Sequence, residues 1–162
     1  MKQIMNLAIA CSIIKKNWRA SVVVLCSSLL LTLFCWTGGH SVKADTVIGT
    51  VPAGSGPNAV AVNPVTNKIY VANSGSGNVT VIDGTNNSTT TVAAGSTPVA
   101  VAINSVTNKI YVANADSNNV TVIDGTNNST QTVAAGSQPN AVAVNSETNK
   151  IYVTNLDSNN IT

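Results

Sequence analysis

Beyond residue 44 the sequence contains no cysteine, no histidine and no arginine. The cysteines and the single histidine of the chain all come earlier: Cys11, Cys26, Cys35 and His40. Residues 45–162 therefore have no thiol for a disulfide and no imidazole for a histidine-based catalytic triad. A zinc site with cysteine or histidine ligands is excluded on the same grounds. We expect no catalytic residue and no cofactor here, while an enzyme whose site lies in another part of a longer chain stays open.

Charged residues are also scarce in residues 45–162. Three lysines stand against six carboxylates, a formal net charge of −3, whereas the whole chain carries +2. The positive charge therefore belongs to the first 44 residues. Without a cluster of basic side chains to neutralise phosphates, we expect no nucleic-acid partner.

The first 44 residues have the composition of a targeting segment. Residues 1–19 carry four basic side chains, and residues 20–36 form an uncharged, strongly apolar run. Val42 and Ala44 suit positions −3 and −1 of a cleavage site after Ala44. The pattern predicts a secretory signal peptide with a hydrophobic helix. Because the run is at the lower limit for spanning a bilayer, an uncleaved signal anchor is the alternative. We expect export to the cell surface, the periplasm or the extracellular medium, with membrane contact through this segment only.

A single sequence unit then repeats with little change. It begins at Pro57, Pro98 and Pro139, and the first two copies are identical at 33 of 41 positions. The third copy breaks off at Thr162. A fixed period of about 40 residues indicates a supersecondary unit that buries its core by stacking on copies of itself.

Within one unit, four short runs rich in β-branched and small apolar residues alternate with turns. In the first copy these runs cover 59–63, 68–73, 78–83 and 89–93. Gly, Pro, Asn and Ser between them favour tight turns. Period-two alternation places Ile69 and Val71 on one face of the second run and Tyr70 on the other. The unit therefore predicts an all-β fold of four-stranded antiparallel sheets arranged as β-propeller blades.

Three segments carry a family resemblance: KIYVANSGSGNVTVIDG, KIYVANADSNNVTVIDG and KIYVTNLDSNNIT. With the flanking motifs P-x-A-V-A-V-N and V-I-D-G-T, they resemble the YVTN-family β-propeller repeat over essentially all of residues 45–162. The repeated positions are Tyr70, Asn73, Asp83, Gly84, Tyr111, Asn114, Asp124, Gly125, Tyr152 and Asn155. The resemblance implies blades of about 40 residues, a closed ring of commonly about seven blades, and an exported or surface protein of bacteria or archaea.

The chain departs from that family in its length. It provides an orphan outer strand at 45–56, blades at 57–97 and 98–138, and a partial blade at 139–162. Since propellers have about four or more blades, this ring is incomplete. Three possibilities stay open: the chain is a fragment, the orphan strand completes the third blade, or several copies form a ring. An open stack exposes an apolar blade face at each end and favours self-association.

The Asp-Gly pairs are one candidate for a site. Asp83 and Asp124 could line a shared channel as a ring of carboxylates. The alternative, which we favour, is structural: each aspartate accepts hydrogen bonds within its own turn, while Gly84 and Gly125 supply an unusual φ angle.

A second candidate is the lysine that precedes each repeated tyrosine by two residues: Lys68, Lys109 and Lys150. A row of lysine and tyrosine side chains could bind an anion. Packing is the favoured explanation for a feature present in every copy. The lysine keeps its charge in solvent, and the tyrosine fills space between blades with its hydroxyl paired.

Oxygen ligands in two loops form a third candidate: Asp116, Asn118, Asp157 and Asn159. Ca²⁺ prefers about six to eight oxygens, usually with several carboxylates. These residues are therefore weak calcium candidates, and an ordinary hairpin loop is the favoured interpretation.

The sequence thus predicts an exported, non-enzymatic β-propeller repeat protein with a binding, display or scaffold role. Its expected partner is an unidentified protein or glycan, bound by loops at one face of a ring. Two alternatives from other classes stay open. One is the N-terminal part of a propeller enzyme or redox-cofactor-binding protein, and the other is a self-associating structural protein built from β-repeats.

Overall fold

The structure is a computed structural model that describes residues 49–162. The expected signal segment, residues 1–44, lies outside the described part. Within that part the chain is all-β, with eleven strands and no helix. None of its elements is thus a helix able to span a lipid bilayer.

The strands form three antiparallel sheets, one for each repeat. The first sheet contains β1 (Pro57–Asn63), β2 (Lys68–Asn73), β3 (Asn78–Asp83) and β4 (Thr89–Ala93). The second contains β5 (Pro98–Asn104), β6 (Lys109–Asn114), β7 (Asn119–Asp124) and β8 (Thr130–Ala134). The third contains β9 (Pro139–Asn145), β10 (Lys150–Asn155) and β11 (Asn160–Ile161). Consecutive strands are neighbours in every sheet, so each repeat is a meander of hairpins.

The strand positions expected from the sequence are confirmed in the first repeat, where β2, β3 and β4 match residue for residue. β1 begins two residues earlier than expected, and its pairing with β2 shifts between Pro57 and Ala59. The same shift recurs at Pro98 and opposite Asn155. Proline has no amide hydrogen for the ladder and is tolerated beside such an irregularity, so the strand can start there.

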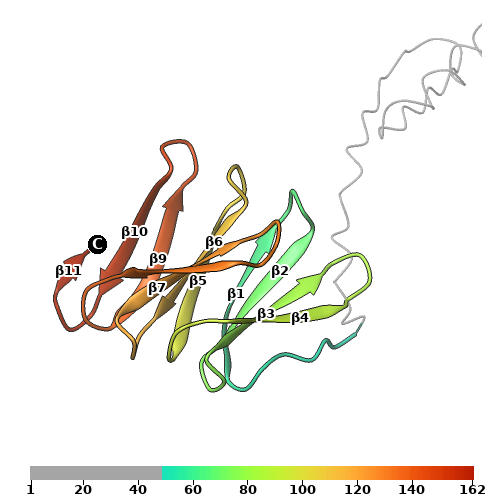
Figure 1. Cartoon of the computed structure of the whole chain (residues 1–162), viewed down its shortest axis with the longest axis horizontal. Coiled ribbons are helices and arrows are strands. Elements are labelled where there is room, and N and C mark those ends of the chain that lie inside the picture. Colours follow the sequence, from blue (N-terminus) through green and yellow to red (C-terminus); the bar gives the residue numbers. More distant parts are fainter. Residues whose placement is uncertain (1–48) are drawn as a thin grey trace, which may run out of the picture. The chain divides into compact units, whose positions relative to one another are not determined.

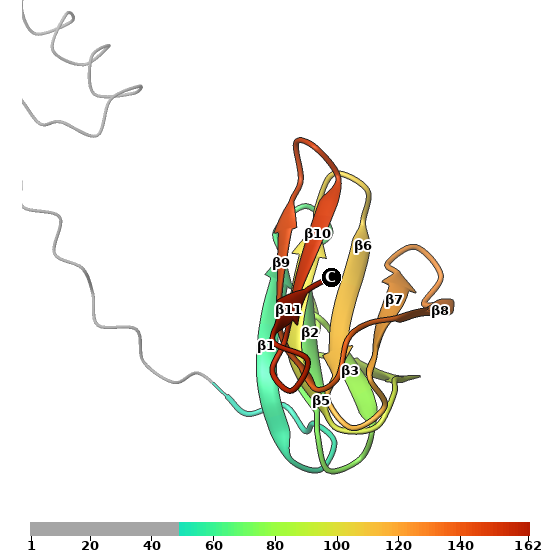
Figure 2. The same ribbon diagram turned by 90° about the vertical axis from the view of Figure 1, so that its left-hand side faces the viewer.

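The three sheets pack side by side in an open, propeller-like stack (Figure 1). Their first strands, β1, β5 and β9, are neighbours. Figure 2 shows these strands along one side of the stack and β7 and β8 at the other. Residues 49–162 do not close a ring.

Each sheet has two different faces because side chains alternate along a strand. On the face that we call the tyrosine face, the first sheet carries Ala59, Tyr70, Ala72, Val79 and Val81. On the opposite face, which we call the aliphatic face, the second sheet carries Val101, Ile103, Ile110, Val112 and Ile123. These two sets form one hydrophobic core, so the tyrosine face of the first sheet packs on the aliphatic face of the second. The expected separation of Tyr70 from Ile69 and Val71 is confirmed.

The contact between the second and third sheets repeats this arrangement. Ala113 and Val120, on the tyrosine face of the second sheet, are buried, as is Val153 on the aliphatic face of the third. Burying a valine or isoleucine side chain contributes about 1.5–3 kcal/mol, so these inter-sheet layers are a main source of stability.

Asparagine side chains also join neighbouring sheets. Asn63 Nδ2 donates a hydrogen bond to Asn108 Oδ1 (2.9 Å), and Asn104 Nδ2 donates to Asn149 Oδ1 (3.0 Å). Asn63 and Asn104 end β1 and β5 and are fully buried. Each link therefore connects the end of one first strand to the hairpin turn of the next sheet.

The orphan outer strand expected at 45–56 does not form over its described residues, 49–56. In a closed ring this segment would extend the outer edge of the last sheet. That edge is β11, which lies at the far end of the stack from β1 and so from the start of this segment (Figure 1). The segment instead lies against its own sheet, where the Gly54 amide donates to Thr80 Oγ1 (3.2 Å) and the Ser55 amide to Ser76 Oγ (3.1 Å).

Candidate functional site

The repeated asparagine that ends the second strand of each sheet is buried and holds a hairpin together. Asn114 Nδ2 donates to Asn119 Oδ1 (2.8 Å) and Thr121 Oγ1 (2.9 Å). The equivalent bonds join Asn73 to Asn78 and Thr80, and Asn155 to Asn160 and Thr162. The side-chain nitrogen at this repeated position is thus engaged with its own hairpin, away from solvent, whereas the buried oxygens Asn73 Oδ1 and Asn114 Oδ1 have no hydrogen-bond partner.

Sequence reasoning missed a glycine that packs against each of these asparagines. A Cβ at Gly95 would lie 2.8 Å from Asn114 Cγ and also against Ser117 Oγ. Gly54 and Gly136 meet their own asparagines in the same way. Real Cβ atoms essentially never approach heavy atoms this closely, so only glycine fits. Its recurrence at the same place in every repeat was the signal that could have found it.

Both aspartates of the Asp-Gly pairs accept hydrogen bonds within their own turns. Asp83 Oδ1 accepts from the Thr85 amide (2.8 Å), and Asp124 Oδ1 accepts from the amide (2.9 Å) and the hydroxyl of Thr126. The Thr126 hydroxyl, its amide and then Lys109 lower the pKa of Asp124 from 3.8 to about 2. The Thr85 amide likewise lowers the pKa of Asp83. Both groups are held as carboxylates, as turn residues are, and neither pKa is raised towards that of a general acid.

The role expected for glycine in these turns is corrected by the structure. Gly84 and Gly125 do not have a positive φ angle, which occurs instead at Asn87 (61°) and Asn128 (62°). Glycine is needed for space, because a Cβ on Gly84 would lie 2.7 Å from the carbonyl oxygen of Asn67. The Gly84 amide donates to that same oxygen at 2.8 Å. The close contact joins two turns of one sheet.

The low pKa of Asp124 leads to a prediction about acid stability. A carboxyl group with a lowered pKa stabilises the folded chain above pH 3.8, and that contribution is lost as the pH falls to about 2. We expect NMR to find the Asp124 titration near pH 2. Asp124→Asn should make the melting temperature less dependent on pH in this range, and Thr126→Ala should raise the Asp124 midpoint. A midpoint at the ordinary aspartate value in the unmodified chain would contradict the turn geometry.

The three repeated tyrosines share one face but differ in burial. Tyr70 is fully buried, Tyr111 is partly buried and Tyr152 is 49% exposed. The expectation of a paired hydroxyl is wrong for Tyr70, whose buried hydroxyl oxygen has no hydrogen-bond partner. Burial, followed by the negative charge of Asp124, raises the pKa of Tyr70.

The repeated lysines make three different contacts. Lys68 Nζ donates to the carbonyl oxygen of Gly125 in the next sheet (3.2 Å), and Lys109 Nζ lies 3.3 Å from Asp124 Oδ2. Lys150 is exposed. Lys68 and Lys109 thus reach oxygen acceptors of neighbouring turns, and the side chain of Lys109 remains 43% exposed, with its charge partly in solvent as expected. Lysines in such different environments do not form a uniform anion-binding row.

The four calcium candidates lie in the loops before β7 and β11. Asp116 Oδ2 accepts a hydrogen bond from Thr97 Oγ1 (2.5 Å), and Asn118 Oδ1 accepts one from the Gln138 amide (2.8 Å). Asp157 and Asn159 are exposed in the equivalent loop. In residues 49–162 no three side chains of His, Cys, Asp or Glu come together as a metal-binding group. In the loop before β7, an oxygen of Asp116 and one of Asn118 are thus already engaged with donors of the protein itself.

Three of the eight positions that differ between the first two repeats lie in the loops that join the second and third strands of their sheets, at 74, 75 and 77 of the first repeat. These loops, 74–77, 115–118 and 156–159, are called the variable loops below. The first is Ser-Gly-Ser-Gly, the second Ala-Asp-Ser-Asn and the third Leu-Asp-Ser-Asn. They lie along one edge of the stack (Figure 1). Their shared serine accepts a hydrogen bond from the preceding connection, as Ser117 Oγ does from the Ser96 amide (3.1 Å). A shared hydrogen bond therefore holds loops that differ in their side chains at one edge.

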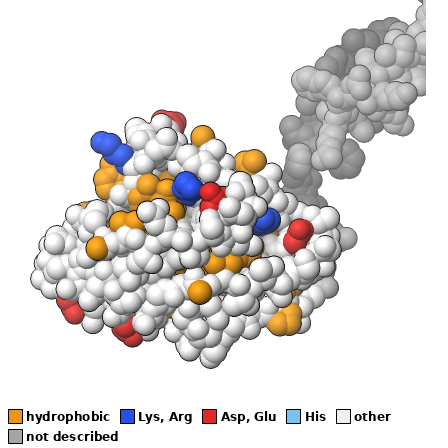
Figure 3. Space-filling model, in the orientation of Figure 1, with side chains coloured by type: hydrophobic (Ala, Val, Ile, Leu, Met, Phe, Trp, Pro, Cys, Tyr) orange, Lys and Arg blue, Asp and Glu red, His pale blue; other side chains and the backbone are white. Residues whose placement is uncertain are grey.

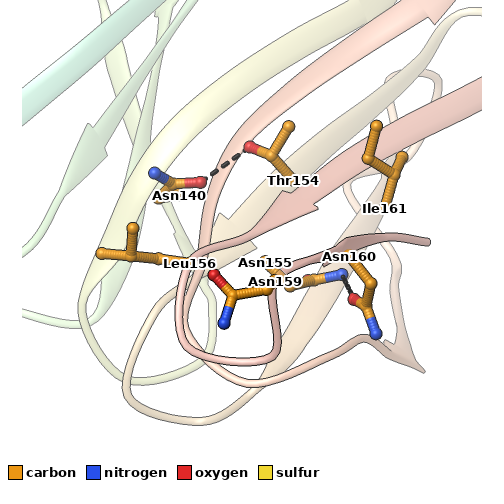
Figure 4. A pocket seen from close by; sticks show the side chains of 7 residues that line it. All are labelled: Asn140, Thr154, Asn155, Leu156, Asn159, Asn160 and Ile161. Carbon is orange, nitrogen blue, oxygen red and sulfur yellow. Dashed lines mark hydrogen bonds between the residues drawn. The ribbon is translucent and has the colours of Figure 1, made fainter.

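A hollow of about 420 Å³ lies beside the third variable loop (Figure 4). It is lined by Asn140, Thr154, Asn155, Leu156, Asn159, Asn160 and Ile161. Thr154 Oγ1 donates to Asn140 Oδ1 (2.7 Å), so two of the polar groups satisfy each other. Figure 3 shows that charged side chains on the visible face are few and scattered. The hollow thus combines amides with two apolar side chains in weakly charged surroundings.

No protein-family model matches the chain, and no curated protein matches it in sequence. Solved structures are similar to it. One is titled hydrazine synthase from Kuenenia stuttgartiensis, with a TM-score of 0.59 and 23% identity, covering 68% of this chain and 33% of that one. Another is a functionally unknown protein from Desulfotomaculum acetoxidans DSM 771, with a TM-score of 0.58 and 16% identity, covering 71% and 43%. This chain spans less than half the length of either. The likeness shows the fold: repeated antiparallel sheets of β-propeller type.

Proposed function

We propose that the chain is an exported, non-enzymatic β-propeller repeat protein of the YVTN type, whose variable loops bind a protein or glycan. The observation that carries the proposal is that a shared frame of hydrogen bonds presents loops of differing sequence at one edge. Asn114 and Asp124 are engaged in hydrogen bonds of the fold, and Tyr70 is buried between sheets. Three of the eight positions that differ between the first two repeats instead lie in these loops at one edge, where a partner can reach them.

The chemistry of the variable loops suits a polar partner. Their differing positions supply carboxylates and amides, together with one exposed apolar side chain, Leu156. Sugar hydroxyls and peptide groups both donate and accept hydrogen bonds, and these side chains offer both kinds of partner. Because the loops are short and tied to a rigid sheet, little ordering accompanies binding.

Export is supported by the first 44 residues, with their basic start, apolar run and small residues before Asp45. A partner at the cell surface or in the periplasm is consistent with this destination. In this role the rigid sheets display the loops to a partner, and no covalent bond is made or broken.

A loop replacement tests the proposal. Combining Ala115→Ser, Asp116→Gly and Asn118→Gly turns the second variable loop into the first. Candidate partners are taken from a glycan array and from a pulldown with the complete protein. We expect binding of the partner found to weaken by about tenfold or more in the triple variant.

The matched control changes the opposite edge. Val106→Glu gives the second repeat the residue that the third already has, Glu147, and should leave the affinity within about twofold. Absence of any partner in both screens, or equal binding by the triple variant, would count against a binding role of these loops.

A further inference from the structure

The two ends of the stack expose complementary halves of the contact that joins its sheets. The first sheet exposes its aliphatic face, with Val60 65% and Val62 57% accessible. The third sheet exposes its tyrosine face, with Tyr152 49% and Ile161 65% accessible. In the second sheet, which is covered on both sides, Val112 is fully buried. Exposed apolar surface of this kind is typical of an interaction site.

We propose that a second copy of this chain docks head to tail, with the tyrosine face of its third sheet on the aliphatic face of the first sheet. The aliphatic face of the first sheet carries Val60, Val62, Ile69 and Val71. The aliphatic face that already packs inside the stack carries Val101, Ile103, Ile110 and Val112. The two sets differ only by valine or isoleucine at one position. The aliphatic face of the second sheet packs on a tyrosine face within the chain. The aliphatic face of the first sheet has almost the same residues and can therefore pack on the tyrosine face of another copy.

The asparagine hydrogen bonds between sheets also leave one donor residue at one end of the stack and one acceptor residue at the other. Asn63 and Asn104 each donate to the turn asparagine of the following sheet. Within residues 49–162 the corresponding inter-sheet bond is not made by Asn145, which ends β9, or by Asn67, the turn asparagine of the first sheet. Both are exposed. Head-to-tail docking brings the donor of Asn145 to the acceptor of Asn67 and repeats the internal link.

Proline burial points in the same direction. Pro98 and Pro139, which begin the second and third sheets, are fully buried, whereas Pro57 at the start of the first sheet is exposed. Pro98 and Pro139 are buried because another sheet precedes theirs in the stack, and no described sheet precedes that of Pro57. The tyrosine face of a second copy supplies such a preceding sheet.

The hollow of Figure 4 is the other half of the contact. Thr154 and Ile161, which line it, occupy the positions of Ala72 and Val79. Both of those residues are fully buried by the second sheet. Because the Thr154 hydroxyl is already bonded to Asn140, covering it leaves no unpaired donor. The hollow thus lies where an incoming aliphatic face packs.

The two surfaces are different, so a docked pair still has one free face of each kind. Such heterologous contacts continue into a ring if the rotation closes, and into a filament if it does not. Both halves of the contact are present in one chain, which is why the occupant is a second copy of it.

Sedimentation of the full chain, with one lysine introduced at a time, tests the proposal. Val60→Lys alters the aliphatic end face and Tyr152→Lys the tyrosine end face. We expect the unmodified chain to associate as its concentration rises, and each variant to weaken association by about tenfold or more, because lysine is poorly buried. Val106→Lys, at a loop position that is 74% exposed and on neither end face, is the matched control and should associate normally.

Mixing the two variants separates head-to-tail docking from other contacts. Each variant keeps the face that the other has lost, so an equal mixture should form a one-to-one pair that grows no further. Because both substitutions are at exposed positions, unchanged circular dichroism and urea midpoints show that each variant is folded. The proposal is overturned by a chain that stays monomeric, by association that survives both substitutions, or by a mixture that forms no pair.

Discussion

Replacing Asn114 by alanine is expected to destabilise the chain by about 2–4 kcal/mol, since it removes two hydrogen bonds and leaves a cavity at a fully buried position. The Thr121 hydroxyl, which is 3% exposed, loses its bond from this amide. Asn119 keeps a bond from Ser117 Oγ, so the loss falls mainly on the buried side of the hairpin. Urea unfolding of the variant and of the unmodified chain measures the difference.

The control for this experiment is Asn58→Ala. Asn58 is exposed on β1, and the second repeat has valine at the equivalent position. We expect its unfolding free energy to stay within about 0.5 kcal/mol of the unmodified chain. If Asn114→Ala were equally mild, the repeated asparagine would not be the hairpin clamp that its contacts indicate.

Replacing Gly95 by alanine is expected to cost about 1–3 kcal/mol, because the new methyl group overlaps atoms that have little room to move. The Ser117 hydroxyl could rotate away, but Asn114 Cγ, 2.8 Å from the added carbon, is fixed by its two hydrogen bonds. The clash therefore acts on the buried amide. A loss of cooperativity in the same urea curves would show that the second sheet is affected locally.

Gly49→Ala provides the matched control, since a Cβ at Gly49 meets nothing within 4 Å. Its unfolding free energy should change by less than about 0.5 kcal/mol. Equal effects at the two glycines would mean that chain flexibility, rather than close packing, explains the result at Gly95.

Much of the fold could be predicted because its signals are local and repeated. Alternation along 68–73 and 78–83 set both the strands and the face of each side chain, and the turn residues set the connections. The outer strand expected at 45–56 could not be judged in this way, since pairing depends on which sheet edge lies nearby. Which sheet edge lies near residues 45–56 depends on the number of sheets and on whether they close into a ring.

The candidate site was less accessible from the sequence. The contact of Asn63 with Asn108 joins residues of different repeats, and no pattern within one repeat reveals it. The role of Gly84 was misjudged for a similar reason, because the oxygen that excludes a Cβ belongs to Asn67 in another turn. Burial likewise separates Tyr70 from Tyr152, although their sequence surroundings are nearly the same.

The equivalence of the two inter-sheet layers also bears on how such a gene can change in length. Each added repeat packs its own aliphatic face on an existing tyrosine face and offers one new tyrosine face, so the end surfaces after an insertion are the same as before it. Unequal crossing-over between near-identical repeats can therefore lengthen or shorten the chain by whole repeats without any compensating substitution in the core. Selection can then act on the number of sheets separately from the chemistry that joins them.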